Sequence, residues 1–279
     1  MATLIDGKTL SAKIRKEIKN KIQKENIKPG LAVIFVGEDE ASKIYVRNKS
    51  KACDEVGVRF EEYNLPSNTT QKELINLIKK LNDKKEIDGI LLQSPIPRNL
   101  DIHEAFAAIS PEKDVDGFNP INIGYLSIGK PKFIPCTPYG VMKMFEEYNI
   151  ELKGKKAVVL GRSNIVGKPM VQCLLSKNAT VTVCHSKTEK IEKEIKNADI
   201  IISAIGQPKF VIGEWIKDGA VVIDVGMNRD ENGKLCGDID FESVSKKASF
   251  ITPVPGGVGP MTIAMLLANT VTACENRNK

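Results

Sequence analysis

Short runs of β-branched and other apolar residues alternate along this chain with stretches of helical periodicity, and this alternation restricts the fold more than any other feature. The runs lie at 31–37, 58–65, 88–97, 156–161, 180–184, 199–206 and 220–226. Apolar residues recur at helical spacing between several of them, at 9–26, 41–56 and 70–83. Strands that alternate with helices of about ten to fifteen residues form parallel βαβ units, so the sequence predicts an α/β fold.

The alternation divides into two halves. It weakens between 111 and 138, where Gly and Pro recur without a strong period, and a connection of that length without regular structure is uncommon and often functional. It resumes after a predicted helix at 139–149. The later strands are apolar along nearly their whole length, which predicts a parallel sheet covered on both faces. We therefore expect two α/β lobes, residues 1–140 and 141–261, the second a Rossmann-like doubly wound parallel sheet.

Charge and composition argue against several classes of protein. The 279 residues carry 41 Lys+Arg against 35 Asp+Glu, a net charge of +6, and the basic residues are spread along the chain. Aromatic residues make up only 5% and do not alternate with basic ones, so no nucleic-acid partner is expected. The hydrophobic fraction of 42% suffices for a core, which excludes general disorder. The excess charge is compatible with acidic small-molecule ligands.

The cysteines predict neither a zinc site nor a disulfide framework. They lie at 53, 136, 173, 184, 236 and 274, with no C-x-x-C pair, and most fall in apolar stretches, where a reduced thiol behaves as a small hydrophobe. Charged residues within the first eight positions leave no signal-peptide core. The uncharged stretch 248–274 is interrupted by prolines and glycines. We expect no metal, no membrane association and a reducing compartment.

A turn with glycines near both ends, 161–169 (GRSNIVGKP), joins a predicted strand to a predicted helix. Such a turn allows close approach to the backbone and directs the free N–H groups of the next helix at an anion, although an ordinary βα turn has the same form. The next strand ends in 184–187 (CHSK), without the carboxylate that would hold an NAD ribose. Arg162, Ser163 and Ser186 instead suit a 2′-phosphate, which favours NADP as the cofactor. The remaining wall comes from two further strand ends, 204–206 and 225–227.

Four further features carry polar chemistry or an unusual backbone. Tyr45 and Lys49 lie four residues apart in a predicted helix, so a phenol and an amine share one face, although a surface pair has the same spacing. Gln93 is a polar residue at the end of an apolar strand. Asp116 precedes a glycine in the irregular segment, where turn formation alone also explains it. The proline- and glycine-rich loop 253–260 is interpreted as a shaped wall that a flat ligand can approach.

Together these motifs resemble the bifunctional methylenetetrahydrofolate dehydrogenase/methenyltetrahydrofolate cyclohydrolase family of one-carbon metabolism. The matching segments occur in the family's order over essentially the whole length: YVRNK (45–49), GILLQSPIP (89–97), PEKDVDGF (111–118), GRSNIVGKP (161–169), CHSKT (184–188), VIDVGMNR (222–229) and ITPVPGGVGPMT (251–262). The last of them is highly specific. The resemblance implies a folate-binding catalytic domain at 1–140, to which a C-terminal helix at 262–279 returns, an NADP-binding domain at 141–261, and an active-site cleft between them.

The resemblance also implies two reactions. The enzyme would oxidise 5,10-methylenetetrahydrofolate with NADP to the 5,10-methenyl form, and would then hydrolyse that product to 10-formyltetrahydrofolate. It would be a cytoplasmic homodimer that takes part in purine biosynthesis. Oxidation requires mainly that the reactants are positioned, whereas in hydrolysis a water molecule must lose a proton as it attacks.

Individual residues receive roles from the same resemblance. Lys49, Gln93 and Asp116 would form the catalytic set: Lys49 is the catalytic group, Gln93 is hydrogen-bonded to it, and Asp116 binds the pterin ring. The other positions would contact the two ligands, namely Tyr45, Pro255, Gly256 and Gly257 the folate, and Gly161, Arg162, Ser163, Ser186 and Met227 the cofactor. A lysine beside a cationic substrate has its ammonium form disfavoured, so Lys49 is predicted to act as the general base of hydrolysis.

Two other functions fit part of the sequence. An NADP oxidoreductase of similar layout, acting on another small substrate, would have no need for the set of Tyr45, Lys49, Gln93 and Asp116. A non-catalytic nucleotide- or RNA-binding module would use the positive charge, but the chain shows no interleaving of basic and aromatic residues. An assay with methylenetetrahydrofolate and NADP distinguishes all three functions.

Overall fold

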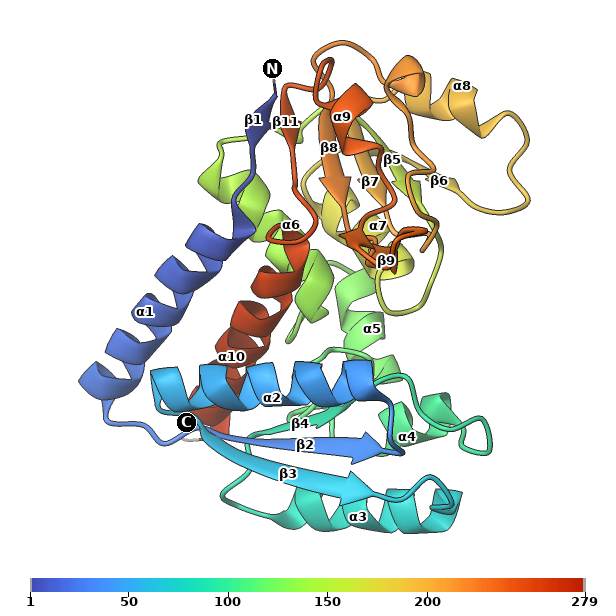
Figure 1. The fold of residues 1–279 in the computed structure, drawn as a ribbon. Coiled ribbons are helices and arrows are strands. Elements are labelled where there is room, and N and C mark those ends of the chain that lie inside the picture. The colour runs from blue at the N-terminus through green and yellow to red at the C-terminus, as the bar shows by residue number, and fades with distance from the viewer. Residues whose placement is uncertain (1, 278–279) are drawn as a thin grey trace. The chain divides into compact units, whose positions relative to one another are not determined.

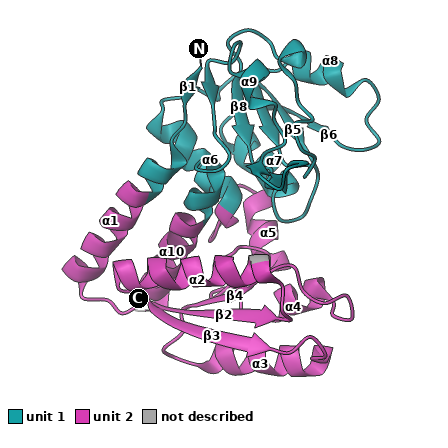
Figure 2. Cartoon of the chain, in the orientation of Figure 1, with its two compact units in different colours: residues 1–11, 137–262 teal, residues 12–136, 263–279 magenta. Residues whose placement is uncertain are grey.

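The computed structural model describes residues 2–277, apart from the side chain of Ala41, and divides into two compact units (Figures 1 and 2). Unit 1 comprises residues 1–11 and 137–262, and unit 2 comprises residues 12–136 and 263–279. The helices α1 (Gly7–Glu25) and α10 (Val258–Arg277) both contribute residues to the two units, and α6 (Cys136–Glu147) contributes its first residue to unit 2. The domain ranges expected from the sequence begin at residue 1 and extend to residue 279. Of these, Met1 and residues 278–279 lie outside the described residues.

Unit 1 is built on a six-stranded parallel sheet in the order β1-β11-β8-β7-β5-β6. The strands are β1 (Thr3–Leu4), β5 (Lys156–Leu160), β6 (Thr180–Cys184), β7 (Ile200–Ser203), β8 (Val221–Asp224) and β11 (Phe250–Ile251). From β5 the chain forms β6 on one side and then crosses to β7 on the other side of β5. This is a doubly wound arrangement, which confirms the predicted Rossmann-like fold. The two-residue strands β1 and β11 are too short to produce a sequence pattern.

Helices and a small hairpin complete unit 1. They are α6 (Cys136–Glu147, of which all but Cys136 belongs to this unit), α7 (Gly167–Ser176), α8 (Ile191–Lys196), α9 (Phe241–Val244), the 3₁₀ helix η1 (Gly213–Trp215), and the antiparallel pair β9 (Asn228–Arg229) and β10 (Leu235–Cys236). One face of the sheet packs Leu160, Ile201 and Val222 against Ile195 of α8 and Val244 of α9. Strands β5, β7 and β8 are therefore buried where the sequence predicts it, but the edge strand β6 is exposed along most of its length and only its last residue, Cys184, is buried.

Unit 2 contains a three-stranded parallel sheet in the order β3-β2-β4. Its elements are β2 (Gly30–Val36), β3 (Arg59–Leu65), β4 (Gly89–Leu92), α2 (Glu40–Val56), α3 (Gln71–Asp83), α4 (Ile102–Ala108) and α5 (Pro120–Ser127). The central strand β2 is buried along its whole length, and its residues Ala32 and Ile34 pack against Leu74 and Ile78 of α3. Alternate residues of β2 point to the opposite face, on which α2 lies (Figure 1).

Two expectations about local structure are wrong. The segment 111–138, expected to lack regular structure, contains α5, whose first residue is a proline and whose cap, Asn119, accepts a hydrogen bond from the N–H of Ile121. This helix is apolar on all sides and therefore has no amphipathic period. The last helix begins at Val258 rather than at 262, because Pro260 lies in its first turn, where a missing N–H is tolerated.

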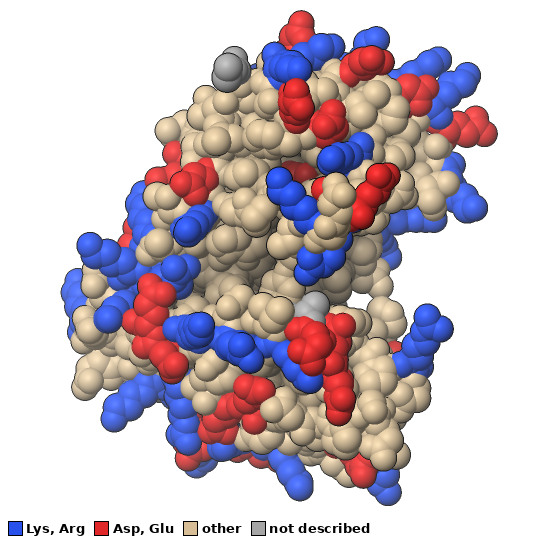
Figure 3. All heavy atoms as spheres, in the orientation of Figure 1, with Lys and Arg blue, Asp and Glu red and all other residues tan. Residues whose placement is uncertain are grey.

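Charges of both signs and free thiols occur among the described residues. Lys and Arg side chains are interspersed with Asp and Glu over the face drawn in Figure 3. All six cysteines are free thiols, and all but Cys236 are buried. Within residues 2–277 no helix is long and apolar enough to cross a membrane, and no group of three or more His, Cys, Asp or Glu side chains is placed to hold a metal ion.

Candidate functional site

A lysine and a glutamine that are far apart in the sequence meet in the interior of unit 2. Lys49 lies on α2, Gln93 directly follows β4, and Nζ of Lys49 donates a 2.6 Å hydrogen bond to Oε1 of Gln93. Both residues are buried, with 8% and 9% of their surface exposed. The amide Nε2 of Gln93 donates to the carbonyl oxygen of Ser94 at 2.7 Å. Because this second bond fixes the amide, its oxygen faces Lys49.

The surroundings of Lys49 disfavour its charged form. Burial lowers the pKa of Lys49, and the charge of the nearby Asp116 opposes this effect without reversing it. Burial also raises the pKa of the partly exposed Asp116, which the charge of Lys49 opposes. A neutral amine keeps one lone pair as well as its N–H donors, so Lys49 can accept a proton while it donates to Gln93.

Helix α2 presents Tyr45 and Lys49 one turn apart, as their spacing predicts. Asp39 caps the start of the helix by accepting a hydrogen bond from the N–H of Ser42 at 2.7 Å, and Gly57 ends it in a left-handed conformation. Tyr45 is partly exposed, and burial raises the pKa of its phenol. The ring therefore remains neutral and is suited to stacking on a flat ligand.

The segment around Asp116 is held by buried polar contacts of its neighbours. Asn269 on α10 donates from Nδ2 to the carbonyl oxygen of Val115 at 2.8 Å. Asp114 accepts a 2.8 Å hydrogen bond from the N–H of Asn119, and burial raises its pKa to about 6. Asp116 thus follows one fixed residue and precedes the capped start of α5, which restricts where its carboxylate lies.

Cys136 belongs to the same cluster, although sequence reasoning did not select it. Its Sγ donates to the carbonyl oxygen of Val115 at 3.4 Å. Burial and the charge of Asp116 raise the pKa of the Cys136 thiol well above its ordinary value, so this neighbour of Lys49 stays protonated and neutral. No local pattern distinguishes it from the other buried cysteines, because its place beside Asp116 and Lys49 depends on tertiary contacts.

The turn after β5 in unit 1 presses against the end of β7. Gly161 has a φ of +106°, and a Cβ at this position would lie 2.4 Å from the carbonyl oxygen of Ala204. Only glycine fits there. This contact lies where β5 and β7 end. The strand order reverses there, because β6 lies on one side of β5 and β7 on the other, and doubly wound sheets bind nucleotides at such a point.

Exposed polar groups leave β5 and β6 at the same edge of the sheet. Leu160 and Cys184 are Cα partners in the parallel pair, so Arg162 and Ser186, two residues beyond each, emerge from neighbouring strand ends. Both side chains are exposed. A guanidinium and a hydroxyl, with no carboxylate between them, form a donor set that fits a ribose 2′-phosphate.

The start of α7 differs from the sequence-based expectation. Oγ of Ser163 accepts hydrogen bonds from the N–H groups of Val166 at 3.2 Å and Gly167 at 3.3 Å, and the Ser163 carbonyl accepts one from Lys168 at 3.0 Å. Pro169 has no N–H. The N–H groups of this first turn are therefore not free, as the sequence-based expectation had them, because Ser163 accepts those of Gly167 and Lys168.

The remaining predicted residues lie elsewhere in unit 1. Met227 follows β8 and is 49% exposed. Pro255 is exposed, Gly256 partly exposed and Gly257 buried in the loop between β11 and α10. The Gly256 carbonyl accepts a 3.0 Å hydrogen bond from the N–H of Lys8, which anchors this loop to the start of α1. The structure thus brings Lys49, Gln93 and Asp116 together in unit 2, while the residues predicted for the cofactor lie in unit 1.

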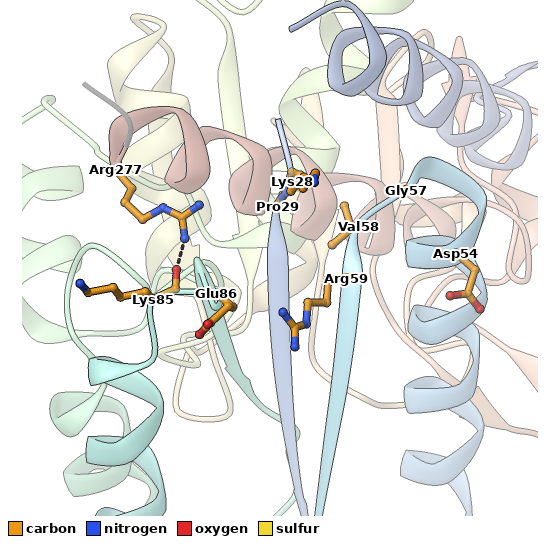
Figure 4. Close-up of a pocket in the computed structure, with 9 residues that line it drawn as sticks. All are labelled: Lys28, Pro29, Asp54, Gly57, Val58, Arg59, Lys85, Glu86 and Arg277. Atoms are coloured by element: carbon orange, nitrogen blue, oxygen red, sulfur yellow. Dashed lines mark hydrogen bonds between the residues drawn. The ribbon is translucent and has the colours of Figure 1, made fainter. Parts of the chain in front are cut away.

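A hollow of about 1000 Å³ in unit 2 is lined by none of these residues. Figure 4 shows that its lining includes Pro29 and Arg59, at the amino-terminal ends of β2 and β3, and Arg277 near the end of α10. Parallel sheets bind ligands at the carboxyl ends of their strands. Gln93 follows the carboxyl end of β4, so the Lys49 cluster, and not this hollow, is the candidate active site.

Comparison with known proteins gives consistent matches over the whole chain. The model of the tetrahydrofolate dehydrogenase/cyclohydrolase catalytic domain matches residues 5–116, and that of the NAD(P)-binding domain of the same family matches residues 135–278. The "Bifunctional protein FolD" of Campylobacter hominis is 56% identical over 99% of this chain and 98% of its own length.

Solved structures agree with these matches. The bifunctional FolD methylenetetrahydrofolate dehydrogenase/cyclohydrolase from Campylobacter jejuni has a TM-score of 0.97 and 51% identity, covering 99% of this chain and 100% of its own. The Trypanosoma brucei methylenetetrahydrofolate dehydrogenase-cyclohydrolase, solved with NADP and an inhibitor, has a TM-score of 0.95 and 40% identity, covering 100% and 99%.

Proposed function

Since this chain belongs to the tetrahydrofolate dehydrogenase/cyclohydrolase family, we propose that it catalyses both reactions of that family's name. It oxidises 5,10-methylenetetrahydrofolate with NADP and then hydrolyses the 5,10-methenyl product to 10-formyltetrahydrofolate. Unit 2 binds the folate and unit 1 binds NADP in this proposal. The two family models, a catalytic domain over 5–116 and an NAD(P)-binding domain over 135–278, support that division.

One observation carries the proposal: the buried hydrogen bond between Lys49 and Gln93. Burial lowers the pKa of this amine, so it can give up its proton at a lower pH than an exposed lysine and serve as a base. An oxidoreductase without a hydrolytic step has no use for such a group, so this contact favours the bifunctional enzyme over a simple dehydrogenase.

The oxidation step depends on positioning. The nicotinamide of NADP supplies the oxidising chemistry of this step when it is bound. The adjacent nitrogens of the folate share the positive charge that develops on the carbon, so no protein acid or base is required. Tyr45 stacks on the aromatic part of the folate, Asp116 binds the pterin ring, and the loop with Pro255, Gly256 and Gly257 contacts the same ligand.

The hydrolysis step requires proton transfer. Water attacks the methenyl carbon and loses a proton to Nζ of Lys49, and a bond from that carbon to one ring nitrogen then breaks. Lys49 returns a proton to this nitrogen, the hydroxyl formed from the water releases its remaining proton to solvent as the C=O bond forms, and the carbon remains on the other nitrogen as a formyl group. Gln93 holds the amine by accepting one of its N–H bonds, which leaves the lone pair available to the water. The cationic substrate further disfavours the ammonium form.

The cofactor is held by groups from β5, β6 and β8 in this proposal. Arg162 and Ser186, exposed at neighbouring strand ends, bind the 2′-phosphate, and Ser163 contributes from the same turn. Gly161 lets the turn pack against Ala204 at the end of β7 and contacts the cofactor through its backbone in this proposal, as does Met227. The lack of a carboxylate at the end of β6 supports NADP over NAD.

We also infer a cellular setting. The cysteines are free and mostly buried, which supports a reducing compartment such as the cytoplasm. The formyl group of the product is in the form needed for purine biosynthesis. A homodimer is proposed from the family resemblance, and sedimentation of the purified protein tests it.

A two-wavelength assay tests the proposed function. Purified protein is mixed with methylenetetrahydrofolate and NADP, and the absorbances of NADPH and of methenyltetrahydrofolate are followed together. We expect NADPH to accumulate while the methenyl product stays low, because the second activity consumes it. Absence of NADPH contradicts the dehydrogenase, and persistent methenyl product contradicts the cyclohydrolase. Methenyltetrahydrofolate supplied without NADP measures the hydrolysis alone.

The pH profile of hydrolysis should report on Lys49. The neutral amine is the active base, so kcat/KM is expected to rise with pH and to level off once Lys49 is deprotonated. Because burial lowers this pKa, the plateau should begin below the value of about 10.4 that is ordinary for lysine. Rates are measured from about pH 6 to 10, with the reaction in the absence of enzyme subtracted. A profile that falls with pH contradicts the role of Lys49 as base.

A further inference from the structure

Two buried carboxylates lie behind the predicted cofactor wall of unit 1. Asp224 ends β8 and is 3% exposed, and Asp238 follows β10 and is completely buried. Charged side chains are seldom buried to this degree unless they are fully hydrogen-bonded. The sequence analysis gave neither of them a role: Asp224 lies within the quoted segment 222–229, and Asp238 follows the hairpin after it in no quoted motif.

Asp238 joins two segments that are apart in the sequence. Its Oδ2 accepts hydrogen bonds from Oγ of Ser203 at 3.0 Å and from the N–H of Ile205 at 2.8 Å. Its Oδ1 accepts from the N–H of Gln207 at 3.0 Å and from Nδ2 of Asn228 at 2.9 Å. The first three donors belong to the chain leaving β7, and the fourth belongs to β9, just after β8. One side chain thus fixes both segments.

Asp224 stabilises this arrangement by accepting backbone hydrogen bonds. Its Oδ1 accepts hydrogen bonds from the N–H of Gly226 at 2.9 Å and from the N–H of Asp238 at 3.0 Å. Its Oδ2 accepts one from the N–H of Ile239 at 3.0 Å. Burial raises the pKa of Asp224 to about 7, although these N–H bonds act in the opposite direction. The backbone of Asp238 is therefore held by the same carboxylate that holds the end of β8.

The two carboxylates are packed directly against backbone. A Cβ on Gly237 would lie 1.8 Å from Oδ2 of Asp224, and a Cβ on Gly226 would lie 2.2 Å from Oδ1 of Asp238. Both positions therefore exclude any side chain. The arrangement leaves little freedom for the wall segments 204–206 and 225–227, since each is tied to one of the two acids.

We propose that Asp238 is a positioning residue for the dehydrogenase reaction: it fixes the end of β7 and, through Asn228, the segment that follows β8, against which the nicotinamide half of NADP binds. The inference rests on the proposed function. In that function the 2′-phosphate binds at the ends of β5 and β6, so the other half of the dinucleotide extends across the switch point to β7 and β8. Asp238 has no exposed surface and acts only through the groups it holds.

Asp238→Asn tests the proposal. The amide keeps one acceptor oxygen, so two of the four donors lose their partner while the side-chain shape is retained. Hydrogen bonds to a buried charged group are strong enough that the Kd for NADP, measured by calorimetry, and the KM for NADP should rise by about tenfold or more. Hydrolysis of methenyltetrahydrofolate without NADP should change less than about twofold, because that step uses no cofactor.

Asp199→Asn is the matched control. Asp199 is also a carboxylate of unit 1, but it precedes β7 at the opposite end of the strand, where it pairs with Lys217 and accepts the N–H of Lys156. This variant loses the same charge and should bind NADP as the wild type does. If both variants weaken NADP binding equally, the effect is general and the proposal is wrong.

Ser203→Ala keeps the proposal testable if Asp238→Asn does not fold. Ser203 is completely buried and donates to Oδ2 of Asp238, so its removal should weaken NADP binding by about three- to tenfold. An unchanged Kd in Asp238→Asn, or in Ser203→Ala where the first variant is unfolded, overturns the positioning role. Failure of the wild-type protein to bind NADP contradicts the proposed function itself, which separates the two conclusions.

Discussion

Replacing Lys49 with glutamine is expected to lower cyclohydrolase activity by about 10²- to 10⁴-fold, the usual contribution of a general base. Glutamine has a similar length and can still donate a hydrogen bond to Gln93, but it has no basic lone pair to accept a proton from water. Dehydrogenase activity should persist in part, within about tenfold, because oxidation depends on positioning. Both activities are measured on the same preparation, with circular dichroism as the test of folding.

Lys51→Gln is the control for this prediction. Lys51 lies on the same helix two residues further on, and its side chain is exposed. The substitution makes the same chemical change outside the buried cluster, so both activities should remain near those of the wild type. Unchanged cyclohydrolase activity in Lys49→Gln would show that another group accepts the proton.

Replacing Arg162 with alanine is expected to raise the KM for NADP by about 10- to 100-fold while the KM for NAD changes little. The exposed guanidinium lies at the carboxyl edge of the sheet, and in the proposed function it donates charge-assisted hydrogen bonds to the 2′-phosphate, which NAD lacks. Losing a hydrogen bond to a charged group costs about 1.5–3 kcal/mol, and about 1.4 kcal/mol corresponds to tenfold in affinity. The ratio of kcat/KM for NADP to that for NAD measures the loss of discrimination.

Lys177→Ala provides the comparison for Arg162→Ala. Lys177 is exposed at the opposite end of α7. Its replacement by alanine therefore removes one positive charge from unit 1 without altering the strand ends. It should leave the ratio unchanged. Equal losses for NADP and NAD in Arg162→Ala would contradict a contact to the 2′-phosphate, and would indicate that the substitution disturbs the turn after Gly161. The cyclohydrolase activity of the variant, measured without NADP, should be preserved.

Most of the fold could be predicted from local patterns. The central strands β5, β7 and β8 are buried runs of β-branched residues, and α3 has Leu74, Ile78 and Leu81 on its buried face. These features follow from the periods of 2.0 and 3.6 residues that burial imposes on strands and helices. Helix α5 escaped prediction because a helix that is apolar on all sides has no such period, and its start depends on a single capping residue, Asn119.

The candidate site, like the fold, could be predicted from the sequence only in part. The sequence motifs identified Lys49, Gln93 and Asp116 as separate features and, through the family resemblance, as one set. No local pattern predicts the 2.6 Å hydrogen bond between Lys49 and Gln93, and none predicts that the thiol of Cys136 lies beside Asp116. The same holds for Ser163, whose hydroxyl accepts hydrogen bonds from the N–H groups of Val166 and Gly167 at the start of α7.

The sequence by itself therefore determined the α/β class, the doubly wound sheet and the residue types available for folate and NADP chemistry. Tertiary structure alone decided which polar groups are buried together, as for Asn269 with Val115 and for Asp238 with Ser203 and Asn228. The physical reason is that hydrophobic periodicity indicates whether each residue is buried, but not which other residues it contacts. A buried donor needs an acceptor wherever the topology brings one, and the partner then lies tens or more than a hundred residues away.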